Sequence, residues 1–172
     1  PEGGYTSYAD LLLNAGKRYG VNPFILASKL INEHGSDGNS GSVSGKVEGY
    51  EGYYNYFNIG AYAHSGRSAI ENGLIYAKEH GWDSREKSIM AGTEFFAKDY
   101  IRSNKTTAYF QKFNVMNGAS AVARGQYMTA LWGANSTGVT LGKGYVSAYS
   151  SALTFEIPVY LSMPTLPAPY PR

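Results

Sequence analysis

The sequence predicts a single α+β domain that is mostly helical, with a small flexible β-lobe or hairpin around residues 36–58. Apolar residues recur at spacings of three and four along most of the chain, which is the periodicity of amphipathic helices. Residues 35–57 depart from that pattern, because glycines and serines crowd the first part and tyrosines the second. The chain has 172 residues, of which 43% are apolar and 16% charged, enough to build one buried core.

The first two helices are predicted from their ends as well as their periodicity. Residues 8–19 carry apolar side chains on one stripe, and Gly20 supplies a stop. A second helix is predicted over residues 24–34, because Asn22 is a favoured cap and Pro23 fits the first helical position. These two helices should pack their apolar stripes into the core.

Further helices are predicted in the rest of the chain. One covers residues 68–79, and Asp83 or Ser84 caps a long helix that runs through Ile101. Shorter helices are expected at residues 107–113, 126–134 and 144–155. The body of the domain is therefore expected to be helical from end to end, apart from the lobe.

The C-terminal end of the sequence has the composition of a linker. Residues 158–172 hold five of the seven prolines, which is typical of a segment that leaves a domain. We therefore expect one folded domain at residues 1–160 and a Pro-rich tail or linker at residues 161–172. The start at Pro1 is typical of a piece of a longer protein and shows no signal peptide.

Composition excludes several classes of function. A net charge of +2 is too small to indicate nucleic-acid binding, and no apolar run approaches the roughly 18 residues of a membrane span. The absence of cysteine removes thiol chemistry, and His34, His64 and His80 lack metal-ligand spacing. Each histidine is interpreted as a surface or capping residue. No phosphate-binding or dinucleotide motif occurs, so we expect neither a metal nor a cofactor.

One acidic residue has the position that acid catalysis needs. Glu33 lies three residues after Leu30 and seven after Leu26, so it falls on or beside the apolar stripe, in the last helical turn. Partial burial and the negative end of the helix dipole both disfavour the carboxylate anion. A general acid needs such surroundings. Taken alone, however, a glutamate at a helix end is more often a plain surface residue.

Four blocks, taken in order, make the interpretation specific. They are ASKLINEHG at residues 27–35, YYNYFNIGAY at 53–62, GWDSREKSI at 81–89 and GQYMTALWGA at 125–134. The second block fits the pattern Tyr-Asn-(Phe/Met/Tyr)-(Phe/Tyr)-(Gly/Asn)-Ile-Gly-Ala. Together the blocks resemble the catalytic core of the bacterial peptidoglycan N-acetylglucosaminidases, glycoside hydrolase family 73, over nearly the whole chain.

The resemblance implies a lysozyme-like helical body and hydrolysis of the β-1,4 bond that follows N-acetylglucosamine in peptidoglycan. It implies Glu33 as the essential acid and Tyr127 as a second catalytic residue in the cleft. Other positions implied to bind substrate, as motif residues or as cleft-facing aromatics, are Tyr53, Tyr54, Asn55, Phe57, Gln126 and Trp132. The implied partner is a peptidoglycan glycan strand. The resemblance also implies that the chain acts outside the cell, as a monomeric catalytic domain of a larger cell-wall protein.

Three questions stay open at the level of sequence. The second catalytic carboxylate has no fixed counterpart, and the candidates are Asp37, Glu48, Glu51 and Glu71. A loop carboxylate could activate water, or the acetamido group of the substrate could take part with Tyr127. A glycan-binding module without turnover and a muramidase or lytic transglycosylase are alternative functions. Finally, Tyr56, Phe57 and Ile59 could form an ordinary strand with one buried face, and Asn55 and Asn58 could only satisfy backbone groups at a bend.

Overall fold

The computed structural model describes Gly4, residues 7–113, residues 131–146 and scattered positions from 154 to 166. The chain divides into two compact units, Pro1–Thr106 and Thr107–Arg172. The expected domain end at residue 160 falls within the second unit and stays a prediction.

The first two predicted helices are confirmed. Helix α1 (Tyr8–Tyr19) begins at Ser7, whose hydroxyl accepts a hydrogen bond from a backbone N–H of the first turn. It ends at Gly20, which has the left-handed φ of 71° that glycine adopts without strain. Helix α2 (Pro23–His34) begins at Asn22, whose side chain caps its first turn.

The next two helices are also confirmed, with small differences at their ends. Helix α4 (Ala69–Glu79) follows Ser68, and helix α5 (Arg85–Asp99) is capped by Ser84, whose hydroxyl accepts from a first-turn N–H. The long helix ends at Asp99, two residues earlier than expected. A short 3₁₀ helix, η1 (Ile101–Ser103), carries the chain on from there.

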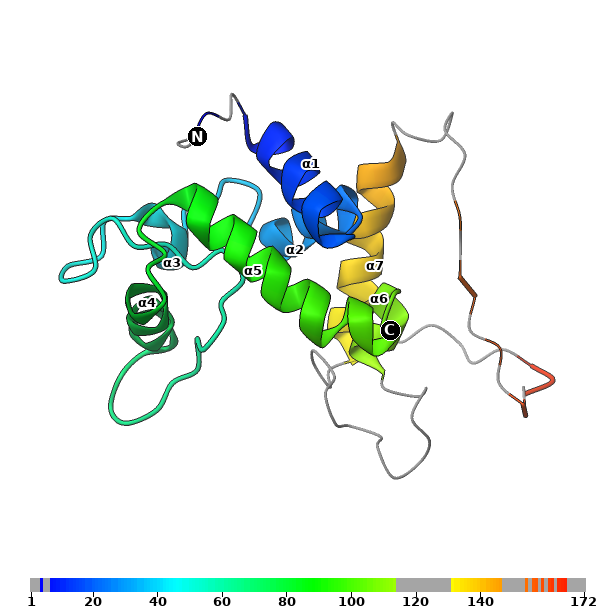
Figure 1. The fold of residues 1–172 in the computed structure, drawn as a ribbon. Helices are drawn as coiled ribbons and strands as arrows, with labels where there is room; N and C mark the ends of the chain where they lie inside the picture. Colours follow the sequence, from blue (N-terminus) through cyan, green and yellow to red (C-terminus); the bar gives the residue numbers. More distant parts are fainter. Residues whose placement is uncertain are drawn as a thin grey trace. The chain divides into compact units, whose positions relative to one another are not determined.

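The core of the first unit lies where three helices meet. Helix α1 packs against both α2 and α5, as Figure 1 shows for the blue and green ribbons. Each helix contributes apolar side chains with almost no exposed surface, including Leu11, Ala15, Leu26, Ile89 and Phe96. The chain that follows α2 adds to the same core through Val43, Tyr54 and Tyr56.

The β-lobe or hairpin expected around residues 36–58 is wrong. That stretch contains the short helix α3 (Gly41–Ser44) and turns, and no strand occurs in residues 7–113. Two physical reasons explain the difference. Left-handed glycines, such as Gly45 and Gly52, bend the chain every few residues. The backbone N–H groups of the tyrosine segment bond to other elements, because Tyr54 N donates to the Trp82 carbonyl and Asn55 N to the Ser42 carbonyl.

The second unit contains two described helices, α6 (Ala108–Lys112) and α7 (Leu131–Tyr145), which contact each other. Helix α6 matches the prediction for residues 107–113. Helix α7 differs, because it continues past Ala134, where a break was expected, as far as Tyr145. Residues 135–145 contain no proline, and their glycines weaken a helix without forbidding it. The first residues of the helix expected at 126–134, and most of that at 144–155, lie outside the described part.

Candidate active site

Glu33 lies in the last turn of α2, as predicted. Its side chain is half-buried, and its Oε2 accepts a hydrogen bond of 2.9 Å from Nδ2 of Asn58. Helix α2 ends immediately afterwards, because Gly35 takes a φ of 73° that ends the helical path. The carboxylate is therefore presented at a helix end and held by an amide from a different segment, 25 residues further along the chain.

The neighbour of Glu33 anchors this helix end to two loops. His34 is buried, its Nε2 lies 2.8 Å from the Tyr56 carbonyl oxygen, and its Nδ1 lies 2.6 Å from the Ser40 hydroxyl. A carbonyl can only accept, so Nε2 carries the proton and Nδ1 accepts from Ser40. Burial lowers the pKa of His34 below its ordinary value and keeps the ring neutral. The interpretation of His34 as a surface or capping residue is therefore wrong.

A fully buried asparagine fixes the turn that carries Asn58. Asn55 Nδ2 donates to the carbonyls of Ile59 and Gly73, both at 2.8 Å, and its Oδ1 accepts from the Ile59 N–H. Helix α4 can approach this turn closely because Gly73 has no side chain. A Cβ added at Gly73 would lie 2.9 Å from the Cβ of Ala61. Within this turn Asn58 has a left-handed φ of 49°, which asparagine tolerates better than most residues.

The aromatic segment packs inward as well as outward. Tyr54 and Tyr56 are both buried and stack with their ring centroids 6.5 Å apart. The Tyr56 hydroxyl lies 2.8 Å from the Tyr8 hydroxyl, and the Arg85 guanidinium lies over the Tyr54 ring at 4.7 Å. Burial raises the pKa of Tyr56, so the phenol stays protonated. This segment joins the start of α1 to the start of α5.

The predicted substrate-binding residues divide into two groups by exposure. Tyr53 and Phe57 keep part of their surface exposed, whereas Tyr54 and Asn55 are buried, at 7% and 0% exposure. In this structure Asn55 satisfies backbone groups at a bend, which is the alternative that the sequence left open. Tyr127 and Gln126 lie outside the described residues, as does the side chain of Trp132, so their roles stay predictions.

The four candidates for a second carboxylate are all exposed. Glu71 has a defined structural task, because its Oε2 accepts from both the backbone N–H and the hydroxyl of Ser68 in a capping box. The hydrogen bond from the Ser68 backbone is the main reason that the pKa of Glu71 is lowered. Asp37 accepts from the Asn39 amide in the loop that follows α2.

Asn58 is the residue that sequence reasoning missed at this site, since it was interpreted only as a residue of a bend. The signal was present in the family pattern, which allows glycine or asparagine at this position. Those two residue types indicate a left-handed backbone. They do not indicate that the side chain reaches Glu33, because that contact depends on how two distant segments pack.

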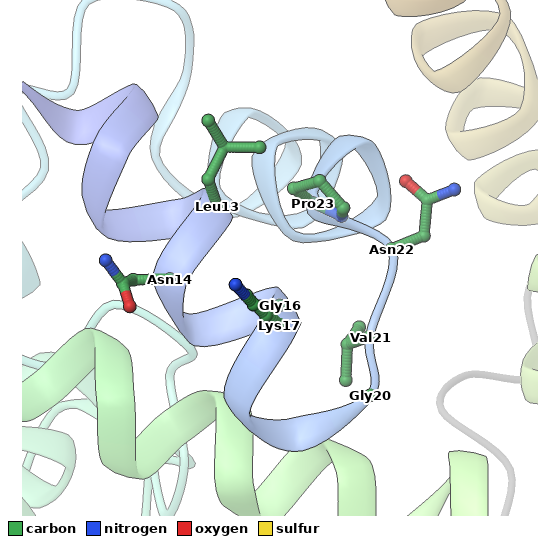
Figure 2. Close-up of a pocket in the computed structure, with 8 residues that line it drawn as sticks. All are labelled: Leu13, Asn14, Gly16, Lys17, Gly20, Val21, Asn22 and Pro23. Atoms are coloured by element: carbon green, nitrogen blue, oxygen red, sulfur yellow. The ribbon is translucent and has the colours of Figure 1, made fainter.

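A groove of about 570 Å³ lies at the turn between α1 and α2 (Figure 2), away from the glutamate. Its lining residues are Leu13, Asn14, Gly16, Lys17, Gly20, Val21, Asn22 and Pro23. Pro23 begins α2 and Glu33 lies in the last turn, so about 15 Å of helix separates this groove from the carboxylate. The groove is therefore not part of the candidate site.

Within the part of the chain that the structure describes, no three acidic or histidine side chains gather in a way that could hold a metal ion. None of the described helices combines the length and the apolar character required to cross a membrane.

Comparison with known proteins connects this arrangement to a class of enzymes. No protein-family model matches the chain. The bifunctional autolysin of Staphylococcus epidermidis is 32% identical over 153 residues, which is 85% of this chain and 11% of that protein. The bifunctional autolysin of Staphylococcus aureus strain MSSA476 is 29% identical over 154 residues, 85% of this chain and 12% of that protein. The chain thus spans little more than a tenth of these curated relatives.

Solved structures agree with the sequence relatives. A catalytic mutant of S. aureus autolysin E, in which a glutamate is replaced by alanine, in complex with the disaccharide NAG-NAM, matches with a TM-score of 0.65 at 28% identity. The match covers 81% of this chain and 60% of that one. S. aureus glucosaminidase B matches with a TM-score of 0.55 at 28% identity, covering 79% of this chain and 52% of that one.

The mostly helical body therefore has the lysozyme-like fold that the resemblance implied, without the small β-lobe. The predicted resemblance to the bacterial peptidoglycan N-acetylglucosaminidases is confirmed, and the chain is a homologue of bacterial autolysins and glucosaminidases.

Proposed function

We propose that this domain hydrolyses the β-1,4 bond between N-acetylglucosamine and N-acetylmuramic acid in peptidoglycan, with Glu33 as the general acid. The observation that carries the proposal is the position of the Glu33 carboxylate, half-buried at the end of α2 and held by Asn58. Support comes from autolysin E, whose catalytic mutant, with a glutamate replaced by alanine, is known in complex with the disaccharide NAG-NAM.

In this proposal Glu33 donates its proton to the glycosidic oxygen as the sugar–oxygen bond breaks. A general acid must meet that oxygen at hydrogen-bond distance, so its direction matters as much as its proton. The α2 end fixes the backbone of Glu33, His34 fixes the helix end, and Asn58 fixes the carboxylate. Tyr127 is proposed to position the acetamido group of the substrate.

The group that completes the reaction is proposed to be a loop carboxylate that activates water or the acetamido group itself. Single replacement of Asp37, Glu48, Glu51 and Glu71 by the matching amide distinguishes them. Glutamine is the right substitute at Glu71, because it can still serve in the capping box and leaves α4 intact. A loss of turnover at one position identifies the base, whereas normal turnover in all four variants favours the acetamido group.

The proposed substrate and location follow from the same relatives. We place the action of the domain at the cell wall outside the cell, on glycan strands, as a monomeric catalytic part of a larger protein. Because the chain spans only 11–12% of the curated autolysins, these remain proposals for the whole protein.

The test is digestion of purified peptidoglycan followed by identification of the new reducing ends. Reducing N-acetylglucosamine is the expected product. Reducing N-acetylmuramic acid would indicate a muramidase, anhydro-muramic acid a lytic transglycosylase, and no release a binding module. Each of these three results would contradict the proposed reaction.

Glu33→Gln tests the role of the glutamate in the same assay. The amide keeps the shape of the side chain but cannot donate the carboxyl proton, so turnover should fall by about a hundredfold or more. Binding of the variant to insoluble peptidoglycan should be unchanged. Glu79→Gln is the matched control, because Glu79 is also a glutamate at a helix end but is exposed. Near-normal hydrolysis by Glu33→Gln would remove Glu33 from the mechanism.

A further inference from the structure

The two polar atoms of the Asn58 side chain differ, because one is hydrogen-bonded to Glu33 and the other has no hydrogen-bond partner among the described residues. Its Nδ2 donates to Glu33 Oε2 at 2.9 Å. Its Oδ1 is buried and has no hydrogen-bond partner among the residues that the structure describes. A buried acceptor without a partner is costly, so such an atom in a folded protein calls for an explanation.

The chemistry of a general acid supplies that explanation. When Glu33 is ionised, both of its oxygens can only accept, and an N–H donor is the partner it needs. When Glu33 is protonated, one oxygen carries a hydrogen and needs an acceptor. An amide offers both, and a half-turn about its last side-chain bond exchanges the two, because that torsion is broad and roughly two-fold.

We propose that Asn58 is the positioning residue of Glu33 in both halves of the catalytic cycle. When Glu33 is a carboxylate, Nδ2 of Asn58 donates to it. When Glu33 is a carboxylic acid, Oδ1 of Asn58 accepts from it. This proposal rests on the proposed function of Glu33 as the general acid. It assigns to Asn58 the task of keeping the carboxyl group in one direction while its proton leaves and returns.

The surrounding turn makes this possible. Asn58 is fixed through its backbone, because its carbonyl accepts from the Ala61 N–H at 3.1 Å and Asn55 ties the turn to α4. Only the side-chain torsions of Asn58 are then free to change. Since the backbone has a left-handed φ of 49°, the residue types that fit without strain are few, chiefly glycine, asparagine and aspartate.

The titratable side chains beside the pair, on α2 and on the adjoining loop, are the same in every variant below. His34, next in α2, is kept neutral by burial, and the Tyr56 phenol on the adjoining loop stays protonated. Lys29 lies one turn earlier in α2, with its ammonium over the ring of Phe96 at 4.4 Å. None of these groups changes in the variants below, so differences between those variants report on position 58.

Asn58→Gly removes the amide and keeps a residue that suits the backbone. We expect kcat on peptidoglycan to fall tenfold or more, with KM changed less than about threefold, because the amide touches the acid rather than the sugar. Asn104→Gly is the matched control, since Asn104 is also an asparagine with a left-handed φ, 59°, at the end of η1. It should keep normal kcat, and both variants should melt close to the native protein.

Asn58→Asp provides a signature that a purely structural role would not give. At about pH 7.5 two adjacent carboxylates repel and neither can donate, so the variant should be no more active than Asn58→Gly. At about pH 5 the two carboxyl groups can share one proton, which restores a hydrogen bond to Glu33. The activity of Asn58→Asp relative to Asn58→Gly should therefore rise at least several-fold as the pH falls.

The outcomes separate this inference from the function on which it rests. If the native domain releases no reducing N-acetylglucosamine, or Glu33→Gln stays active, the proposed function fails. If the native domain is active and Glu33→Gln is not, normal kcat in Asn58→Gly overturns the role of Asn58 alone. A constant ratio between Asn58→Asp and Asn58→Gly across the pH range would also overturn it.

Discussion

His34 connects the end of α2 to two loops, and His34→Ala tests how much that connection stabilises the first unit. The substitution removes the hydrogen bonds to Tyr56 and Ser40 and leaves the Tyr56 carbonyl without its buried donor. It also removes an edge-on contact between the two rings, whose centroids lie 5.9 Å apart. All three losses destabilise the folded state.

The magnitude follows from these contacts. A net hydrogen bond contributes about 1 kcal/mol, an unsatisfied buried carbonyl costs about 1–3 kcal/mol, and an aromatic contact adds about 0.5–1.5 kcal/mol. Because these effects overlap, we expect the free energy of unfolding to fall by about 2–4 kcal/mol. A domain of this length should then melt roughly 5–15 °C lower.

The pH dependence gives a second and more specific measure. Burial lowers the pKa of His34 below 6.5 in the folded state, so the unfolded chain binds a proton first as the pH falls. The stability due to a neutral His34 is therefore complete above about pH 6.5 and is lost below it. Between about pH 7.5 and 5.5 one such histidine lowers the free energy of unfolding by at most about 1.4 kcal/mol.

The assay is urea unfolding at both pH values, carried out on the native domain, on His34→Ala and on His64→Ala. His64 is exposed, so its replacement should keep both the stability and the pH dependence. At about pH 7.5 His34→Ala should have a lower free energy of unfolding than the native domain. Between about pH 7.5 and 5.5 its free energy of unfolding should fall by less than that of the native domain. Unfolding curves for His34→Ala that match the native ones at both pH values would refute the reasoning.

Two further pairs of substitutions test the packing beside the site. Gly92→Ala should lower the free energy of unfolding, measured in urea, by about 1–3 kcal/mol, because an added Cβ would collide with the ring of Phe57. Gly138→Ala is the control. It should not lower the free energy of unfolding, because Gly138 has open space around it in α7. Tyr54→Ala should cost about 3–5 kcal/mol because the ring is buried, whereas Tyr53→Ala should leave stability within about 1 kcal/mol and weaken binding to peptidoglycan. Equal unfolding curves for the two tyrosine variants would contradict that distinction.

The helices were predictable because their signals are local. Asn22 and Pro23 start α2, and Ser84 caps α5, through contacts within three residues of the helix start. A cap and an apolar stripe lie close together in the sequence, so the pattern shows both. Glu33 was predictable for the same reason, since its place in the last turn of α2 depends only on where the helix ends.

The loop between α2 and α4 was not predictable, because its hydrogen bonds are made to distant residues. Alternating aromatic residues favour a strand when only neighbours are considered. In the structure Tyr56 N donates instead to the hydroxyl of Ser88 in α5, and Tyr54 N donates to the Trp82 carbonyl. Such partners come into reach only after the helices have packed. Tertiary contacts therefore replace the sheet ladder.

The same contacts explain why the aromatic motif has two kinds of residue. Tyr54, Asn55 and Tyr56 point into the body of the first unit and hold the turn, whereas Asn58 at the end of the turn reaches Glu33. Replacing a buried residue of the motif would move the turn and misplace the Asn58 amide, so activity would fall without any lost sugar contact. A loss of activity at these positions is therefore evidence for substrate binding only when the unfolding curve is unchanged. On that criterion Tyr53 and Phe57, which keep exposed surface, are the residues of this motif at which a sugar contact can be tested directly.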